Sequence, residues 1–374
     1  MDTTKREVIK SRVLQTLEKS QYAATSLVPL SGGTANFTYH AILKAPLQDG
    51  TKDVLVKHGE EFVANSASFK LALSRCRVEV ECLKTLTNLQ GEGQVVSPSH
   101  SNFVVRTPKF YHFDERNNTQ IQEILLNGKN LKTYALMTYP PNTQASARSE
   151  CHQLGRALGR WLHDFHCRSA TQSKLRHALA GNTEMQQLKH MINFSWLQER
   201  VAQFPAVLTE AKNIFAKVKD MATKELEDGS RLQPIHGDFW TGNVLLPEGP
   251  IQEGSEVPVF VIDWEMSQMG LPNLDLGQMI GEMYELKLYK DITAGLWMLQ
   301  GFLEGYGPVT EDFAYRTAIQ MGTHLVCFGG VEGWGTPEQV EMVARIGRDI
   351  IIHAWQKDST WFNSGELACL FQSC

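Results

Sequence analysis

The spacing of apolar residues along the chain changes near residue 140. Before that point, residues 5–19 and 66–89 carry apolar side chains at helical intervals, which predicts two amphipathic helices. Short apolar runs bounded by turn residues predict strands between and after these helices. The predicted strands are Leu27–Leu30, Phe37–Leu43, Asp53–Lys57, Phe103–Phe113 and Leu131–Tyr139. The first part of the chain is therefore predicted to form a small mixed sheet with helices.

The pair Pro140–Pro141 interrupts this pattern. Proline halts both helices and central strands, so we place a lobe boundary there. The predicted helices beyond it span residues 149–167, 184–203 and 206–228, followed by predicted strands at 243–246 and 257–262 and by further helices. We expect an α+β fold with two lobes. The smaller lobe, residues 1–140, is rich in strands, and the larger one, residues 141–374, is mainly helical.

Composition narrows the class of protein. The chain has 374 residues, of which 42% are hydrophobic, as is ordinary for a globular protein with a sizeable core. The formal net charge of −5 argues against nucleic acid or an anionic membrane as a partner. The seven cysteines are odd in number and include no CxxC pair, so we expect a reducing, cytoplasmic compartment. No apolar run reaches the roughly 18 residues that a membrane span needs.

The strongest chemical signal lies between residues 234 and 265. Four residues separate Asp238 from Asn243, and an apolar run further on ends in Asp263. This order of acid, amide and second acid is the layout of a kinase catalytic loop and its metal-binding acid. Asp238 is predicted to accept the proton of a substrate hydroxyl. Asn243 and Asp263 are predicted to hold Mg²⁺ through oxygen atoms.

Residues suited to a nucleotide come earlier in the chain. Gly32–Gly33 and Asn36 lie in a turn between two predicted strands, where backbone amides can approach phosphate oxygens. The alternative interpretation is an ordinary hairpin whose turn contains Gly-Gly. Lys57 ends a predicted strand, from which a lysine can reach the phosphates of ATP. A carboxylate on the next helix is expected to hold Lys57, and of Glu79 and Glu81 we prefer Glu79.

The segments His236–Asn243 and Ile262–Glu265 resemble the aminoglycoside phosphotransferase and choline kinase family, and the resemblance extends over most of the chain. It implies a bilobal protein-kinase-like fold with ATP and Mg²⁺ as cofactors. It also implies that backbone groups near Met137 and Tyr139 hold adenine. The spacing from Asp263 onwards resembles the choline kinase branch of the family, while other segments look like fungal hydroxytryptamine kinases.

Aromatic and acidic residues near the motif suggest what the acceptor carries. Trp240 and Glu265 flank the catalytic acids in sequence, and Glu282 and Trp334 come from elements expected to surround them. Carboxylates and indole faces bind amine cations, and each cation–π contact is worth about 0.5–2 kcal/mol. The same residue types also serve as core and bracing residues. We expect the acceptor to be a small amine-bearing molecule that is phosphorylated on a hydroxyl, with neither nucleic acid nor membrane as a partner.

Three other functions stay open. A protein kinase needs an activation segment with an Ala-Pro-Glu-like anchor, and the short stretch after Asp263 contains none. A methylthioribose or other sugar kinase shares the early glycine turn but differs around Asn243 and Trp264. An inactive nucleotide-binding regulatory module is expected to lack part of the catalytic set, whereas this chain retains the lysine and all three motif residues.

Overall fold

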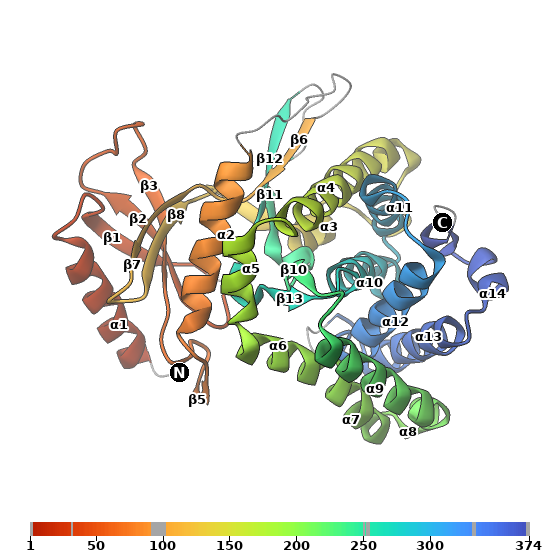
Figure 1. Ribbon diagram of the computed structural model, residues 1–374. Helices are drawn as coiled ribbons and strands as arrows, with labels where there is room; N and C mark the ends of the chain where they lie inside the picture. The colour runs from red at the N-terminus through yellow and green to blue at the C-terminus, as the bar shows by residue number, and fades with distance from the viewer. Residues whose placement is uncertain are drawn as a thin grey trace. The chain divides into compact units, whose positions relative to one another are not determined.

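Strands dominate the first part of the structure and helices the rest (Figure 1). The computed structural model describes residues 3–30, 33–90, 102–249, 251, 255–330 and 334–371. The chain divides into an N-terminal unit, Met1–Gln94 with Thr107–Leu126, and a C-terminal unit, Val95–Arg106 with Asn127–Cys374. The predicted α+β class is confirmed. Residues 95–106 belong to the C-terminal unit, although the residues before and after them in sequence belong to the N-terminal unit. A single boundary at residue 140 does not describe this division, and that boundary stays a prediction.

A five-stranded antiparallel sheet forms the core of the N-terminal unit, in the order β1-β2-β3-β8-β7. Its strands are β1 (Ala24–Pro29), β2 (Phe37–Leu43), β3 (Asp53–His58), β7 (Phe110–Asp114) and β8 (Thr119–Glu123). Every second residue of β2 is buried, as expected for a sheet with one face against a core. Helix α1 (Thr3–Leu17) adds Ile9, Val13 and Leu17, spaced one turn apart, to the same hydrophobic cluster.

The helix predicted over residues 66–89 begins later than expected. Strands β4 (Phe62–Val63) and β5 (Ser66–Lys70) form a hairpin, and α2 runs over Ser74–Gln90. The sequence Asn65–Ser68 explains the difference, because serine and asparagine side chains compete with the helical hydrogen bonds of the backbone. The prediction was wrong for the first turns and right for the remainder.

Two predicted strands were also wrong. Residues 103–113 form two strands, β6 (Asn102–Arg106) and β7; Pro108 lies between them and lacks the N–H that a continuous ladder needs. Residues 131–139 form helix α3 (Leu131–Thr138), whose buried residues recur with helical spacing. The Asn130 side chain caps α3 by accepting a hydrogen bond of 2.7 Å from the Thr133 N–H. A short apolar run does not by itself distinguish a helix from a strand.

Two small sheets position the catalytic segments in the C-terminal unit. One has the order β6-β12-β11-β9, with β6 and β12 parallel, and the other pairs β10 with β13. The strands are β9 (Gly128–Asn130), β10 (Gln233–Ile235), β11 (Val244–Pro247), β12 (Glu256–Val261) and β13 (Gln268–Gly270). The strands predicted at residues 243–246 and 257–262 are thus confirmed within a residue.

Helices make up most of the C-terminal unit. They are α4 (Arg148–Ser169), α5 (Ser173–Ala180), α6 (Thr183–His190), α7 (Trp196–Gln203), α8 (Pro205–Leu208), α9 (Lys212–Asp228), α10 (Asn273–Lys290), α11 (Ala294–Tyr306), α12 (Glu311–Cys327), α13 (Pro337–Trp355) and α14 (Ser359–Asn363). The helix predicted over residues 184–203 is α6 and α7 joined by a π-helical turn, Met191–Ser195. In the part of the chain that the structure describes, no helix combines the length and apolar character needed to cross a bilayer.

Helices α4 and α11 lie side by side with their backbones in contact (Figure 1). Glycines make this approach possible from both helices. A Cβ atom on Gly159 of α4 would lie 1.9 Å from the carbonyl oxygen of Phe302, and one on Gly301 of α11 would lie 2.0 Å from that of His152. Neither position has room for any side chain, so the register of the two helices is fixed.

Candidate active site

Asp238 lies in the loop between β10 and β11, and a glycine fixes the start of this loop. Gly237 has a φ of +80°, a conformation that residues with a Cβ atom rarely adopt. A Cβ atom there would also lie 2.2 Å from the Met266 carbonyl oxygen. After Asp238, the 3₁₀ turn Thr241–Asn243 leads directly into β11.

Asp275, in the first turn of α10, braces this loop by binding its backbone. Its carboxylate accepts hydrogen bonds from the N–H groups of His236 (2.8 Å) and Gly237 (2.9 Å). His166 of α4 lies 3.1 Å from the same carboxylate, and its other ring nitrogen lies 3.0 Å from the Tyr306 hydroxyl. Burial acts to raise the pKa of the Asp275 carboxyl, but the hydrogen bond and charge of His166, with help from His236, hold it below its usual value. The buried acid therefore stays ionised and anchors two backbone amides.

His236 connects the loop to the strand that ends in Asp263. Its Nε2–H donates to the Ile262 carbonyl oxygen (3.0 Å), so Nδ1 is the acceptor for the Asp238 N–H (3.2 Å). Burial lowers the pKa of the ring, against the nearby negative charges of Asp275 and Asp238, and the neutral tautomer satisfies both hydrogen bonds. His236 thus supports the loop, as the sequence indicated.

Three donors orient the carboxylate of Asp238. Its Oδ1 accepts from Gln278 Nε2 (2.8 Å). Its Oδ2 accepts from the Trp240 indole N–H (3.2 Å) and from Asn243 Nδ2 (3.1 Å). The residue is only partly buried. A half-exposed carboxylate held in one orientation is suited to accept a proton from a substrate hydroxyl.

The residues predicted to hold a metal lie at the ends of adjacent antiparallel strands. Asn243 directly precedes β11, Asp263 follows β12, and the Ile262 N–H donates to the Asn243 carbonyl oxygen (3.0 Å). The Asn243 side chain uses its NH₂ group on the backbone and carboxylate of Asp238, so its amide oxygen is the atom available to a cation. An amide oxygen together with a carboxylate fits the oxygen preference of Mg²⁺. Asp263 has a φ of +66°, an uncommon conformation for a non-glycine residue and one often found at functional sites.

In the N-terminal unit, Lys57 of β3 is paired with Glu79 of α2. The Lys57 ammonium donates to Glu79 Oε1 (2.8 Å), and Gln120 of β8 donates to Glu79 Oε2 (2.6 Å). All three side chains are buried. The alternative partner, Glu81, pairs with Lys84 instead, at 3.4 Å. The predicted choice of Glu79 as the lysine partner is confirmed, while nucleotide binding by Lys57 stays a prediction.

Other residues predicted to bind the nucleotide have varied surroundings. Gly32 lies outside the described residues, and Gly33 follows directly. Asn36 is buried and its side-chain oxygen accepts from Arg75 (3.1 Å). Met137 and Tyr139 lie in and just after helix α3, where the Tyr139 N–H donates to the Ala135 carbonyl oxygen (3.0 Å). This amide serves the helix end, and the binding of adenine near Met137 and Tyr139 stays a prediction.

Lys132, near the start of α3, lies among three of the residues predicted to contact the acceptor. Its ammonium is 3.9 Å from the ring centroid of Trp334 and 5.9 Å from that of Trp240. Its positive charge also lowers the pKa of Glu282. Trp334 stacks on Tyr289, with ring centroids 5.8 Å apart. The predicted aromatic and acidic cluster therefore exists, and it already contains a cation of the chain itself. Glu265 is buried in the separate 3₁₀ turn Trp264–Met266.

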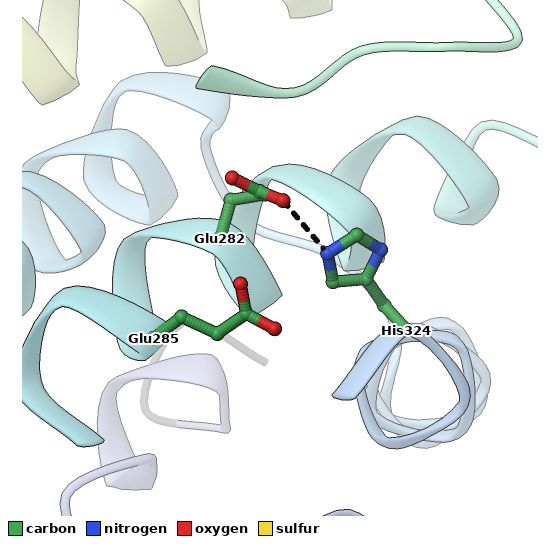
Figure 2. A group of neighbouring side chains, drawn as sticks. All are labelled: Glu282, Glu285 and His324. Atoms are coloured by element: carbon green, nitrogen blue, oxygen red, sulfur yellow. Dashed lines mark hydrogen bonds and ion pairs between the residues drawn. The ribbon is translucent and has the colours of Figure 1, made fainter. Parts of the chain in front are cut away.

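Glu282 and two neighbouring residues form a buried polar group (Figure 2). Glu282 and Glu285, one turn apart on α10, point toward His324 of α12. One Glu282 oxygen lies 3.1 Å from His324 Nε2, and the other accepts from the Thr241 hydroxyl (2.7 Å). Burial acts to raise the pKa of Glu282, but His324, Lys132 and Thr241 together lower it. Two carboxylates and an imidazole are possible metal ligands, but both oxygens of Glu282 are engaged. We interpret Glu282 as a brace for the loop that carries Asn243.

Sequence reasoning missed Gln278, Lys189 and Lys132 as members of the site. Gln278 lies three residues beyond Asp275 and therefore on the same face of α10, a spacing that was visible in the sequence. Lys189 and Lys132 belong to separate segments, α6 and α3, and carry no local signal. Only the fold brings them close.

The oriented Asp238, with an amide and a second acid at the ends of adjacent strands, has the arrangement of a kinase catalytic loop and its metal-binding acid. The chain belongs to the phosphotransferase enzyme family, which residues 46–317 match. The predicted family and class of enzyme are confirmed.

Curated relatives agree with this assignment. The chain is 30% identical to phosphotransferase FrzJ of Cladobotryum sp, with 96% of this chain and 95% of the relative covered. It is 26% identical to 4-hydroxytryptamine kinase of Psilocybe cyanescens, with 85% and 84% covered.

Two solved structures support the fold. An amicoumacin kinase in complex with AMP-PNP, Ca²⁺ and Ami aligns with a TM-score of 0.51 at 11% identity, covering 94% of this chain and 96% of that one. A mutant aminoglycoside 2'-phosphotransferase in complex with GDP aligns with a TM-score of 0.50 at 12% identity, covering 95% and 98%. The protein-kinase-like fold is thereby confirmed.

Proposed function

We propose that this enzyme transfers the γ-phosphoryl group of ATP, with Mg²⁺, to a hydroxyl of a small amine-bearing molecule. The observation that carries the proposal is the Asp238 carboxylate, which donors from Gln278, Trp240 and Asn243 hold in place. Phosphoryl transfer depends mainly on positioning and charge stabilisation. A carboxylate held by three donors meets the first requirement.

Each remaining residue has a defined task in this proposal. Asp238 orients the acceptor hydroxyl and takes up its proton as the hydroxyl oxygen bonds to the γ-phosphorus and the bond from that phosphorus to the β–γ bridging oxygen breaks, with ADP as the leaving group. The side-chain oxygens of Asn243 and Asp263 would hold Mg²⁺, and Lys57, which is paired with Glu79, would contact the nucleotide phosphates. When bound, Mg·ATP supplies the phosphoryl group and the metal charge that offsets the negative charge of the phosphates.

The cluster around Lys132 supports an acceptor with an amine. Trp334 and Trp240 present indole faces to one ammonium group, that of Lys132, and the charge of this group lowers the pKa of Glu282. An acceptor amine would find the same partners if it displaced the lysine. The two 4-hydroxytryptamine kinases among the relatives, 26% and 25% identical to this chain, carry names that fit a hydroxylated aromatic amine. We therefore propose this class of acceptor ahead of sugars.

An ADP-release assay with Mg·ATP tests the proposal. The acceptor panel contains hydroxytryptamines, choline, ethanolamine, aminoglycosides and methylthioribose. We expect turnover with an amine-bearing acceptor, lost in Asp238→Ala and retained in Asp312→Ala, whose side chain is 79% exposed and pairs with Lys357. Turnover with methylthioribose alone, the acceptor of the panel that carries no amine, would overturn the acceptor class. Full activity of Asp238→Ala would overturn the catalytic assignment.

A further inference from the structure

A buried lysine is linked to the proposed catalytic base through one glutamine. Lys189 of α6 is 2% exposed, and its ammonium donates to Gln278 Oε1 at 2.6 Å. Gln278 of α10 in turn donates through Nε2 to Asp238 Oδ1 at 2.8 Å. Three segments that are distant in sequence therefore meet in one chain of hydrogen bonds that ends on the carboxylate.

The order of donors and acceptors in this chain has only one solution. An ammonium group can donate hydrogen bonds but cannot accept them, and a carboxylate can only accept. Gln278 must therefore turn its oxygen toward Lys189 and its NH₂ group toward Asp238. Without the lysine, the amide could rotate by half a turn and place its oxygen against the carboxylate, where two acceptors repel each other. Because of that repulsion the carboxylate alone already favours the NH₂ group, and Lys189 adds a second anchor at the amide oxygen, so Gln278 is held at both ends and cannot swing away from Asp238.

The charges around Lys189 are consistent with an ammonium at this position. Burial lowers the pKa of the lysine, whereas the negative charges of Asp238 and Asp275 act to raise it. A buried cation costs free energy unless nearby groups compensate it. The negative charges of Asp238 in the catalytic loop and of Asp275, which braces that loop from α10, provide this compensation and argue for a role linked to the loop.

We propose that Lys189 is a positioning residue for phosphoryl transfer: it fixes the amide of Gln278 so that Gln278 holds Oδ1 of Asp238 and directs the carboxylate toward the acceptor hydroxyl. The inference rests on the proposed function of Asp238 and adds to it a residue from α6. Lys189 itself touches neither acceptor nor nucleotide. Its effect belongs to the chemical step and not to the binding of ATP.

Three variants and one control test this relay. Lys189→Met removes the donor to Gln278, Gln278→Leu removes the link, and the double variant removes both. The control is Arg316→Met, because Arg316 is also a buried cation and lines the same small cavity as Lys189, but its partner is Glu225. The measurements are kcat and KM for ATP, with and without the acceptor found in the panel, and the thermal midpoint of each variant.

Each single variant is expected to lower kcat by about 10- to 100-fold, the scale that follows from misplacing a reacting group, with KM for ATP within about twofold of wild type. The double variant should be no slower than the slower single variant, because both break the same link. Arg316→Met should lower the thermal midpoint while kcat of the folded enzyme is unchanged. If Lys189→Met does not fold, kcat of Gln278→Leu, a substitution that removes no charge, is compared with kcat of Arg316→Met instead.

Several outcomes would overturn the relay. They are a wild-type kcat in either single variant, losses that multiply in the double variant, or an equal loss of kcat in Arg316→Met. These results differ from failure of the proposed function, in which Asp238→Ala itself would remain active. An inactive Asp238→Ala together with a fully active Lys189→Met would refute the relay alone.

Discussion

Replacing Asp275 by asparagine is expected to impair both stability and catalysis. The carboxylate serves two backbone N–H groups with its two oxygens and also faces His166. An asparagine side chain has one oxygen, so one N–H of the catalytic loop would lose its acceptor and face an NH₂ group instead. A buried polar group left unsatisfied costs about 1–3 kcal/mol, and breaking a buried charged pair costs about 3–5 kcal/mol. We expect the free energy of unfolding to fall by about 3 kcal/mol, the value at which these two ranges meet.

The effect on catalysis should be larger than the effect on stability implies. The two N–H groups belong to His236 and Gly237, directly before Asp238, so a shift of this loop moves the proposed base itself. A misplacement of about 1 Å can cost on the order of 100-fold in rate. We therefore expect kcat to fall by about 100-fold in Asp275→Asn, while the folded protein still binds ATP.

Urea unfolding and the ADP-release assay measure the two effects, with Asp312→Asn as an exposed control. The pKa of Asp275 is lowered in the folded protein, so its stabilising effect is present at neutral pH and is lost only when pH falls below the ordinary range of carboxyl groups, about pH 4. The difference between variant and wild type should therefore be constant between about pH 6 and 8. A variant with wild-type stability and kcat would refute the bracing role of Asp275.

Three further changes test other parts of the structure. Lys132→Met should lower KM for amine acceptors about tenfold by vacating the Trp334 face, with KM for ATP unchanged; an unchanged acceptor KM would show that this face is not used. Gly159→Ala should lower the free energy of unfolding by about 3 kcal/mol. The control Gly181→Ala, whose Cβ would meet no atom closer than 3.4 Å, should change it by less than about 1 kcal/mol. Equal effects of the two substitutions would contradict the close contact between α4 and α11. Burial, with the charge of Arg12, lowers the pKa of His58 from 6.5 to about 4, so stability should fall by up to about 3 kcal/mol as pH drops through this interval. Urea unfolding at pH 7.5 and at pH 5 measures this fall. The free energy of unfolding of His58→Asn should fall less between the two pH values than that of wild type, and an identical fall would show that His58 is not its cause.

The sequence was most informative where function depends on neighbouring residues. The catalytic loop and the acid that ends the next strand lie within one stretch of about thirty residues, and a known chemistry requires their spacing. The pairing of Lys57 with Glu79 was also predictable, because Glu79 and Glu81 lie on different sides of a helix and only one can face the sheet. Elements with strict periodicity, such as α4, were predicted close to their observed bounds.

The errors have physical reasons. The segment 131–139 is short and apolar, and its identity as a helix depends on the Asn130 cap and on burial of one face. The hydrogen bonds that reach Asp238 through Gln278 join distant residues: 40 positions separate Gln278 from Asp238, and 89 separate Lys189 from Gln278. No local pattern encodes such pairs. The aromatic cluster was predicted, but the lysine that lies within it was not, since α3 was expected to be a strand.

The close contact between α4 and α11 has a consequence for the order in which the protein folds. His166 reaches Asp275 from α4 and is itself held by Tyr306 at the end of α11, so one support of the loop depends on a residue synthesised 68 positions after Asp238. During translation, the glycine face of α4 has no partner until α11 has emerged. Contacts between distant parts of a chain form slowly, so a nascent or early refolding chain would contain most of its helices and still be inactive. Recovery of activity during refolding should therefore lag behind recovery of helical structure.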